Sequence, residues 1–162
     1  YGAEALESIR AHKPSYALDQ VTLDIIISTG IVSNMMSTKD DYYYNSTIAH
    51  CVYYGSTVTE KGHHHLHGEV VSLGVLCLEQ YAGDYEELDR IMKFNASVGL
   101  PVCFDDVEID ESEFDKMADK FTQTTEWAHR PKCVNRARMI EVMKETNAKG
   151  REFKKKWKES AK

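Results

Sequence analysis

The stretch GDYEELDRIMKFNASVGLP, residues 83–101, is the clearest sign of a helical fold because it marks both ends of one helix. Asp84 and Glu87 stand three residues apart, which is the spacing of a capping box at a helix start. Apolar residues follow at helical spacing, at Leu88, Ile91 and Met92. Gly99 then supplies a left-handed stop before Pro101. The pattern therefore predicts a complete helix with both of its end signals.

Helical periodicity continues on both sides of this segment. Residues 1–12 have the pattern of a helix from the first residue onward, which suggests a fragment of a longer protein. Pro14 can occupy the first turn of the next helix. Gly30 lies within that next helix, where we expect it to permit close packing. Further apolar or helical segments are expected at 48–52, 70–78, 112–123 and from Asn135 to Gly150. Because no alternating strand pattern and no repeat competes, we predict an all-α helical bundle formed by a single domain, residues 1–162.

Composition and charge exclude several classes of partner. The 162 residues include 26 acidic and 20 basic side chains, which argues against a dedicated nucleic-acid binder. The one basic cluster is expected to be a solvated helix face and consists of Lys154, Lys155, Lys156 and Lys158. No stretch approaches the roughly 18 apolar residues of a membrane span, and no signal peptide opens the chain. We therefore expect a cytoplasmic protein with no nucleic-acid or membrane partner.

The four cysteines at 51, 77, 103 and 133 lie far apart and form no CxxC pair. This spacing indicates neither a zinc ribbon nor a thioredoxin-like motif. Cys77 lies within an apolar run, where a buried reduced thiol is expected. Reduced cysteines agree with the cytoplasmic expectation.

The segment HHHLHGE, residues 63–69, concentrates histidines just before an apolar run. His63 and His67 are four residues apart, so on one helix they would share a face, as in zinc enzymes with an HExxH motif. The glutamate of that motif is missing, because His64 stands in its place. A local histidine site remains one interpretation. A solvated loop at a helix entrance, holding His63, His64 and His65, is the favoured one.

Two other histidine positions carry more information. His67 precedes a glycine and the start of a buried helix, which would hold a ligand rigidly while leaving room for a substrate or a metal. His50 lies in the apolar segment IAHCV, so it is either a satisfied core histidine or a ligand. Glu69 is favoured at an early helical position by the helix dipole, and it could also orient His67 or a neighbouring backbone group.

The string IAHCVYYGSTVTEKGHHHLHGEVVSLGVL, residues 48–76, resembles the metal-binding region of glycerol dehydrogenases, in the iron-containing alcohol dehydrogenase superfamily. The matching features are Ala49-His50, Gly55 and the segment HGEVVSLGVL that begins at His67. The turn Val98-Gly99-Leu100-Pro101 and the last helices are also similar. The separation of 17 residues between the two histidines is specific to this family, whereas the surrounding helices are not.

The resemblance implies a helical fold like the C-terminal domain of these enzymes and a divalent metal, zinc rather than iron. His50 and His67 match the family's two histidine ligands. Its aspartate ligand lies further upstream than the 49 residues that precede His50 here, and no glycine-rich phosphate loop occurs in the chain. The implied protein is the metal- and substrate-binding half of an NAD(P)-dependent polyol dehydrogenase. Its N-terminal nucleotide-binding domain, absent from this chain, would bind most of the NAD(P), so we expect this chain alone to be inactive.

Two departures from the family pattern lie near the implied substrate. Tyr53 stands where many relatives have a further histidine, and Tyr42 to Ser46 replace a glycine-rich approach. The alcohol that the enzyme accepts can therefore differ from glycerol. The tyrosines fit packing at a domain interface equally well.

Three hypotheses follow from these observations. The first is the metal- and substrate-binding half of a polyol dehydrogenase, a homo-oligomer with a small polyol as substrate. The second is a non-catalytic helical module of the same fold. The third is a histidine-rich metal-binding domain that uses His63, His64, His65 and His67 locally.

Overall fold

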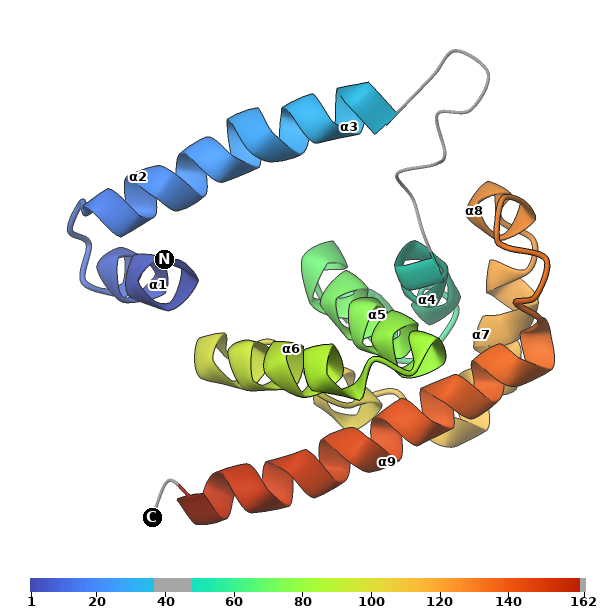
Figure 1. Cartoon of the computed structure of the whole chain (residues 1–162). Coiled ribbons are helices and arrows are strands. Elements are labelled where there is room, and N and C mark those ends of the chain that lie inside the picture. Colours follow the sequence, from blue (N-terminus) through green and yellow to red (C-terminus); the bar gives the residue numbers. More distant parts are fainter. Residues whose placement is uncertain (37–47, 161–162) are drawn as a thin grey trace. The chain divides into compact units, whose positions relative to one another are not determined.

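The computed structural model describes residues 1–36 and 48–160, and the chain divides into two compact units, 1–45 and 46–162. All the regular structure in these described ranges is helical, so the predicted all-α class is confirmed (Figure 1). No helix in them is long and apolar enough to cross a membrane. The single domain expected for residues 1–162 stays a prediction.

The first unit contains α1 (Gly2–Arg10) and a longer helical run. That run consists of α2 (Tyr16–Leu23), a π-helical segment (Asp24–Thr29) and α3 (Gly30–Met36). Ser15 caps α2 by accepting a hydrogen bond from the Leu18 N–H at 3.2 Å, so Pro14 precedes the helix instead of occupying its first turn. The close packing expected at Gly30 is wrong for the described residues, because a Cβ there would meet no atom within 4 Å.

The second unit packs its helices around one apolar core. It contains α4 (Ile48–Ser56), α5 (His67–Ala82), α6 (Tyr85–Val98), α7 (Phe114–Phe121), α8 (Thr125–Ala128) and α9 (Arg136–Ser160). Short 3-10 turns lie at Gly62–His64, Phe104–Val107 and Glu111–Glu113. The largest fully buried side chains include Phe104, Phe114, Phe121, Leu73 and Leu76. Helix α9 runs alongside α5 and α7 (Figure 1).

The end signals predicted for α6 are present. Asp84 Oδ1 accepts a hydrogen bond from the Glu87 N–H at 3.1 Å, and Gly99 ends the helix with a φ of 80°. The reciprocal half of the capping box is replaced, because the Glu87 carboxylate binds Arg90 instead. The apolar positions Leu88 and Met92 are fully buried, as their spacing predicted.

The predicted end of the last helix at Gly150 is wrong. Asn135 caps α9 as expected, with Oδ1 accepting from the Arg138 N–H at 2.9 Å, but the helix continues through Gly150 to Ser160. A Cβ at Gly150 would collide with the carbonyl group of Val102. This glycine therefore allows α9 to lie against a neighbouring segment of backbone.

Glycine also sets the spacing of α4 and α5. A Cβ at Gly74 would collide with the backbone of Ala49, so the two helices approach each other at a position where α5 has no side chain. Ala49 immediately precedes His50, and Gly74 lies two turns into the helix that begins at His67. The contact consequently fixes one histidine-bearing element against the other.

Candidate metal site

The two histidines predicted as metal ligands lie side by side. His50 stands in the first turn of α4, and His67 is the first residue of α5. Their ring centroids are 5.4 Å apart, with the ring planes inclined at 48°. Two residues 17 positions apart in the sequence are thus brought together by the packing of two helices.

The environment of His50 favours the neutral imidazole. Burial lowers the pKa of His50, the positive charge that His67 can carry lowers it further, and Glu126 opposes both effects. Its Nδ1 atom is buried and has no hydrogen-bond partner among the described residues. A neutral ring with an unpartnered nitrogen is the form that binds a metal ion.

The spacing of the pair fits one tetrahedral metal ion. Zinc–nitrogen bonds of about 2.1 Å in a tetrahedral site place the centres of two ligating rings roughly 5 Å apart. The separation of 5.4 Å agrees with this value. Within residues 1–36 and 48–160, however, no three His, Cys, Asp or Glu side chains are placed to hold a metal together. The pair therefore supplies two imidazoles, one fewer than the three protein ligands of a catalytic zinc site.

Glu69 holds the backbone just ahead of His67. Its Oε2 accepts a hydrogen bond from the Leu66 N–H at 2.9 Å and lies 3.5 Å from His65 Nδ1. Glu69 was expected to orient either His67 or a neighbouring backbone group, and these contacts correspond to the second arrangement. The carboxylate thereby fixes the start of α5, where His67 is located.

The remaining histidines of the HHHLH segment do not share a helix face with His67. His63 and His64 belong to a 3-10 turn and are exposed, whereas His65 is extended and separates that turn from α5. His63 Nδ1 contacts the Thr59 carbonyl oxygen at 3.2 Å. The helical i, i+4 geometry considered for a local site is consequently wrong.

His65 is not the solvated residue that was expected. It is half-buried, with Nδ1 near Glu69 and Nε2 at 3.7 Å from Glu108 Oε2. Of the three histidines expected to be solvated, His63 and His64 are exposed.

Tyrosines of α4 complete the surroundings of the pair. The Tyr53 ring meets His67 edge-on, with centroids 4.2 Å apart. Burial raises the pKa of the Tyr54 hydroxyl, and the charge of Glu126, a buried residue of α8, raises this pKa further. The residues Tyr42 to Ser46, expected near the substrate, lie outside the described residues. Sequence reasoning missed Glu126, since nothing in TTEWAH connects it with His50 far upstream.

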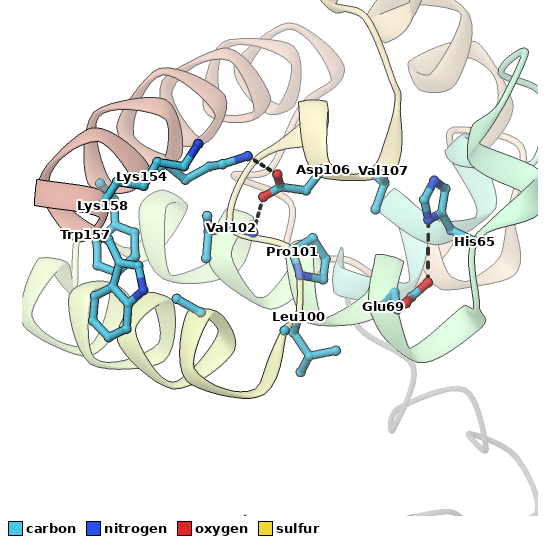
Figure 2. Close-up of a pocket in the computed structure, with 13 residues that line it drawn as sticks. His65, Glu69, Leu100, Pro101, Val102, Asp106, Val107, Lys154, Trp157 and Lys158 are labelled. Carbon is cyan, nitrogen blue, oxygen red and sulfur yellow. Dashed lines mark hydrogen bonds and ion pairs between the residues drawn. The ribbon is translucent and has the colours of Figure 1, made fainter. Parts of the chain in front are cut away.

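Glu69 also lines a cavity of about 390 Å³ (Figure 2). Its walls include His65, Glu69, Pro101 and Trp157. Lys154 and Asp106, which form an ion pair with each other, also line it. Neither His50 nor His67 lines it. The histidine pair and this cavity are therefore separate features.

Known proteins match this chain over part of its length. No family model matches it. The glycerol dehydrogenase of Thermotoga maritima is 30% identical over 108 residues, which cover 64% of this chain and 30% of the relative. The glycerol dehydrogenase of Citrobacter freundii is 40% identical over 55 residues, 33% of this chain and 15% of the relative. The chain thus spans less than a third of these curated relatives.

A solved structure agrees with the sequence matches. The crystal structure of a probable glycerol dehydrogenase from Sinorhizobium meliloti 1021 superposes with a TM-score of 0.61 at 26% identity, covering 69% of this chain and 34% of that one. Sequence and structure are both similar to those of glycerol dehydrogenases over part of this chain. This partial coverage is consistent with a C-terminal domain of a glycerol dehydrogenase-like protein. The predicted resemblance is confirmed.

Proposed function

We propose that the chain is the metal- and substrate-binding half of an NAD(P)-dependent polyol dehydrogenase. The observation that carries this proposal is the His50–His67 pair, with ring centroids 5.4 Å apart and a buried His50 Nδ1 that has no hydrogen-bond partner within residues 1–36 and 48–160. The matches to longer glycerol dehydrogenases support it. An N-terminal nucleotide-binding domain would be the partner that supplies NAD(P) and a further metal ligand.

The residues of this chain would divide the work between holding the metal and shaping its surroundings. His50 and His67 would bind a divalent ion, zinc rather than iron. The bound ion supplies a Lewis acid that polarises the alcohol oxygen for hydride transfer. His67 is exposed, so the open side of the pair is accessible to a small polyol. Tyr53 packs on the edge of His67 and would limit the space next to the substrate. We place the enzyme in the cytoplasm as part of the same proposal.

Of the alternatives, the non-catalytic module keeps an observation in its favour. The described residues contain no complete set of three metal ligands. A module without catalytic activity would not need such a set. The local histidine-rich site has less support, because His63 and His67 lie on different elements.

Zinc titration calorimetry on the 162-residue chain separates these functions. We expect zinc to bind, His50→Ala to weaken binding at least about tenfold, and His63→Ala to leave it unchanged, because the His50 ring lies beside His67 whereas His63 belongs to a separate turn. The His63 variant is the matched control, as it removes an exposed imidazole four residues from His67. Loss of binding in His63→Ala alone would establish the local site instead. Absence of zinc binding in the unaltered chain would favour the non-catalytic module.

A further inference from the structure

The His67 side chain is exposed, and contacts with other rings set its position. Tyr53 meets its ring edge-on, with centroids 4.2 Å apart and planes inclined at 72°, and the His50 ring lies beside it at 5.4 Å. Among residues 1–36 and 48–160, no hydrogen bond or ion pair reaches the His67 imidazole. Exposed side chains change rotamer within nanoseconds unless packing restrains them. The orientation of His67 therefore depends on these ring contacts.

Tyr53 reaches His67 from an anchored position on α4. It follows His50 by three residues, so the two side chains are neighbours on one face of the helix. The Tyr53 side chain is half-buried and packs against the apolar core. The close approach of Gly74 to the Ala49 backbone sets the spacing between α4 and α5. Tyr53 is thus a fixed wall against which the more exposed His67 ring is placed.

A nearby carboxylate does not take over this role from Tyr53. A histidine that binds a metal usually donates its second ring N–H to a carboxylate, carbonyl or water, which fixes the ring. Glu69, the acid nearest in sequence, instead accepts from the Leu66 N–H at 2.9 Å and lies 3.5 Å from His65 Nδ1. An edge-on contact between rings has a preferred geometry of its own, so it can restrain His67 in place of a hydrogen bond.

We propose that Tyr53 is a positioning residue, whose ring, packed edge-on against His67, holds that imidazole beside His50 in the orientation that binds a divalent metal ion. The proposal rests on the proposed function, because it takes the two histidines as metal ligands. It assigns the effect to the aromatic ring of Tyr53 and not to the hydroxyl. Tyr53→Phe should therefore keep the orientation of His67, whereas Tyr53→Leu should lose it.

The first test measures the rotamer of His67 in the metal-free 162-residue chain. Three-bond couplings between the backbone and His67 Cγ report whether the side chain keeps one χ1 rotamer or averages over several. We expect one rotamer in the unaltered chain and in Tyr53→Phe, and averaged couplings in Tyr53→Leu. A single unchanged rotamer in a folded Tyr53→Leu variant would overturn the proposal.

The second test uses Zn²⁺ alone for affinity and Co²⁺ alone for the visible spectrum of the site. We expect Tyr53→Leu to weaken zinc binding about 3- to 10-fold and to alter the cobalt spectrum, whereas Tyr53→Phe restores both. Tyr81→Leu is the matched control, because Tyr81 also packs on the core but lies at the opposite end of α5 from His67. Equal losses of affinity in Tyr53→Leu and Tyr81→Leu would assign the effect to general destabilisation and contradict the proposal.

The conservative variant separates the ring of Tyr53 from its hydroxyl. If Tyr53→Phe weakens zinc binding as much as Tyr53→Leu does, the hydroxyl is responsible and the proposal is rejected. If Tyr53→Leu fails to fold, Tyr53→Met takes its place in both tests, because methionine is also non-aromatic and fills irregular gaps.

Failure of the proposed function would look different. If the unaltered chain binds no zinc, the metal role of the histidine pair fails, whatever the couplings of His67 show. If zinc binds and His50→Ala weakens binding while Tyr53→Leu does not, the metal site stands and the role of Tyr53 is rejected.

Discussion

At the scale of single residues, the four thiols occupy sharply different environments. Cys51, Cys77 and Cys103 are buried, whereas Cys133 is exposed. Burial raises the pKa of Cys77 to about 12 and is also the largest cause of the raised pKa values, about 11, of Cys51 and Cys103. Because the thiolate is the reactive form, we expect one fast-reacting thiol per folded chain at pH 8 and four in urea. Spectrophotometric thiol titration measures both counts, and Cys133→Ser should abolish the fast phase.

Asp105 links stability to pH. Its hydrogen bond from Arg151, Nε to Oδ2 at 2.8 Å, is the largest cause that lowers the pKa of Asp105. A lowered pKa in the folded state contributes stability above the ordinary pKa of an aspartate and loses it as pH falls through the folded value. We expect Asp105→Asn to lower the free energy of unfolding at pH 7 by less than about 1 kcal/mol, because the pair is partly exposed. Urea unfolding at pH 7 and near pH 2 should show this difference vanish in acid. A difference that persists in acid would assign the effect to packing.

Residue patterns revealed the histidine pair but not its surroundings. The resemblance of IAHCV and HGE to a family motif indicated His50 and His67, and the structure places their rings together. Glu126 could not be inferred, because its position depends on how a four-residue helix packs against α4. The unusual burial of His65 was also hidden, since it depends on Glu108, far along the chain.

At the scale of secondary-structure elements, Gly74 controls how closely α5 approaches α4. An added Cβ would collide with the Ala49 backbone, which cannot yield as a flexible side chain can. We expect Gly74→Ala to destabilise the chain by about 1–3 kcal/mol and to weaken zinc binding, because the two histidine-bearing helices must separate.

Gly68 provides the matched comparison on the same helix. A Cβ at Gly68 would meet no atom within 4 Å, so Gly68→Ala should leave the chain as stable or up to about 1 kcal/mol more stable. Urea unfolding followed by circular dichroism measures both variants. If Gly74→Ala and Gly68→Ala change the free energy of unfolding equally, the contact between α4 and α5 does not exclude a side chain at position 74.

End signals were easier to predict than contacts between helices. Asp84 and Gly99 act through hydrogen bonds and dihedral angles within a few residues, so the local sequence suffices for α6. Gly30 and Gly150 show the opposite. Close packing was expected at Gly30 and a helix end at Gly150, yet Gly150 packs inside a continuing helix and Gly30 meets no described neighbour. Glycine looks the same in both roles until the neighbouring backbone is known.

At the scale of the whole molecule, the all-α class was predictable and the division into units was not. Helical periodicity repeats along the chain, whereas the division into units 1–45 and 46–162 depends on which helices pack together. In the first unit the helical run exposes large apolar side chains, among them Ile25, Ile26, Ile31, Val32 and Met35. Such surfaces favour association with other protein surfaces.

We therefore expect the chain to self-associate as its concentration rises. Ile26 and Met35 are 68% and 77% exposed, and replacing both with glutamate should shift the equilibrium towards monomer without loss of helix content. Sedimentation velocity over a range of concentrations measures the effect. The double replacement of Glu4 and Glu7 with glutamine on α1 serves as a control for surface charge. Concentration-independent sedimentation of the unaltered chain would contradict the expectation.

The position of His67 at the very start of α5 has a mechanical consequence. His50 and His67 are 17 residues apart, and the segment between them contains the end of α4, a loop and a short turn. An ion bound to both rings would close this segment into a ring and act as a removable cross-link. Such a closure restricts the unfolded chain much as a disulfide does. Chelation would then release the first turn of α5 while the core beneath Leu73 and Leu76 stays intact, so loading with metal would tune the rigidity of one edge of the molecule.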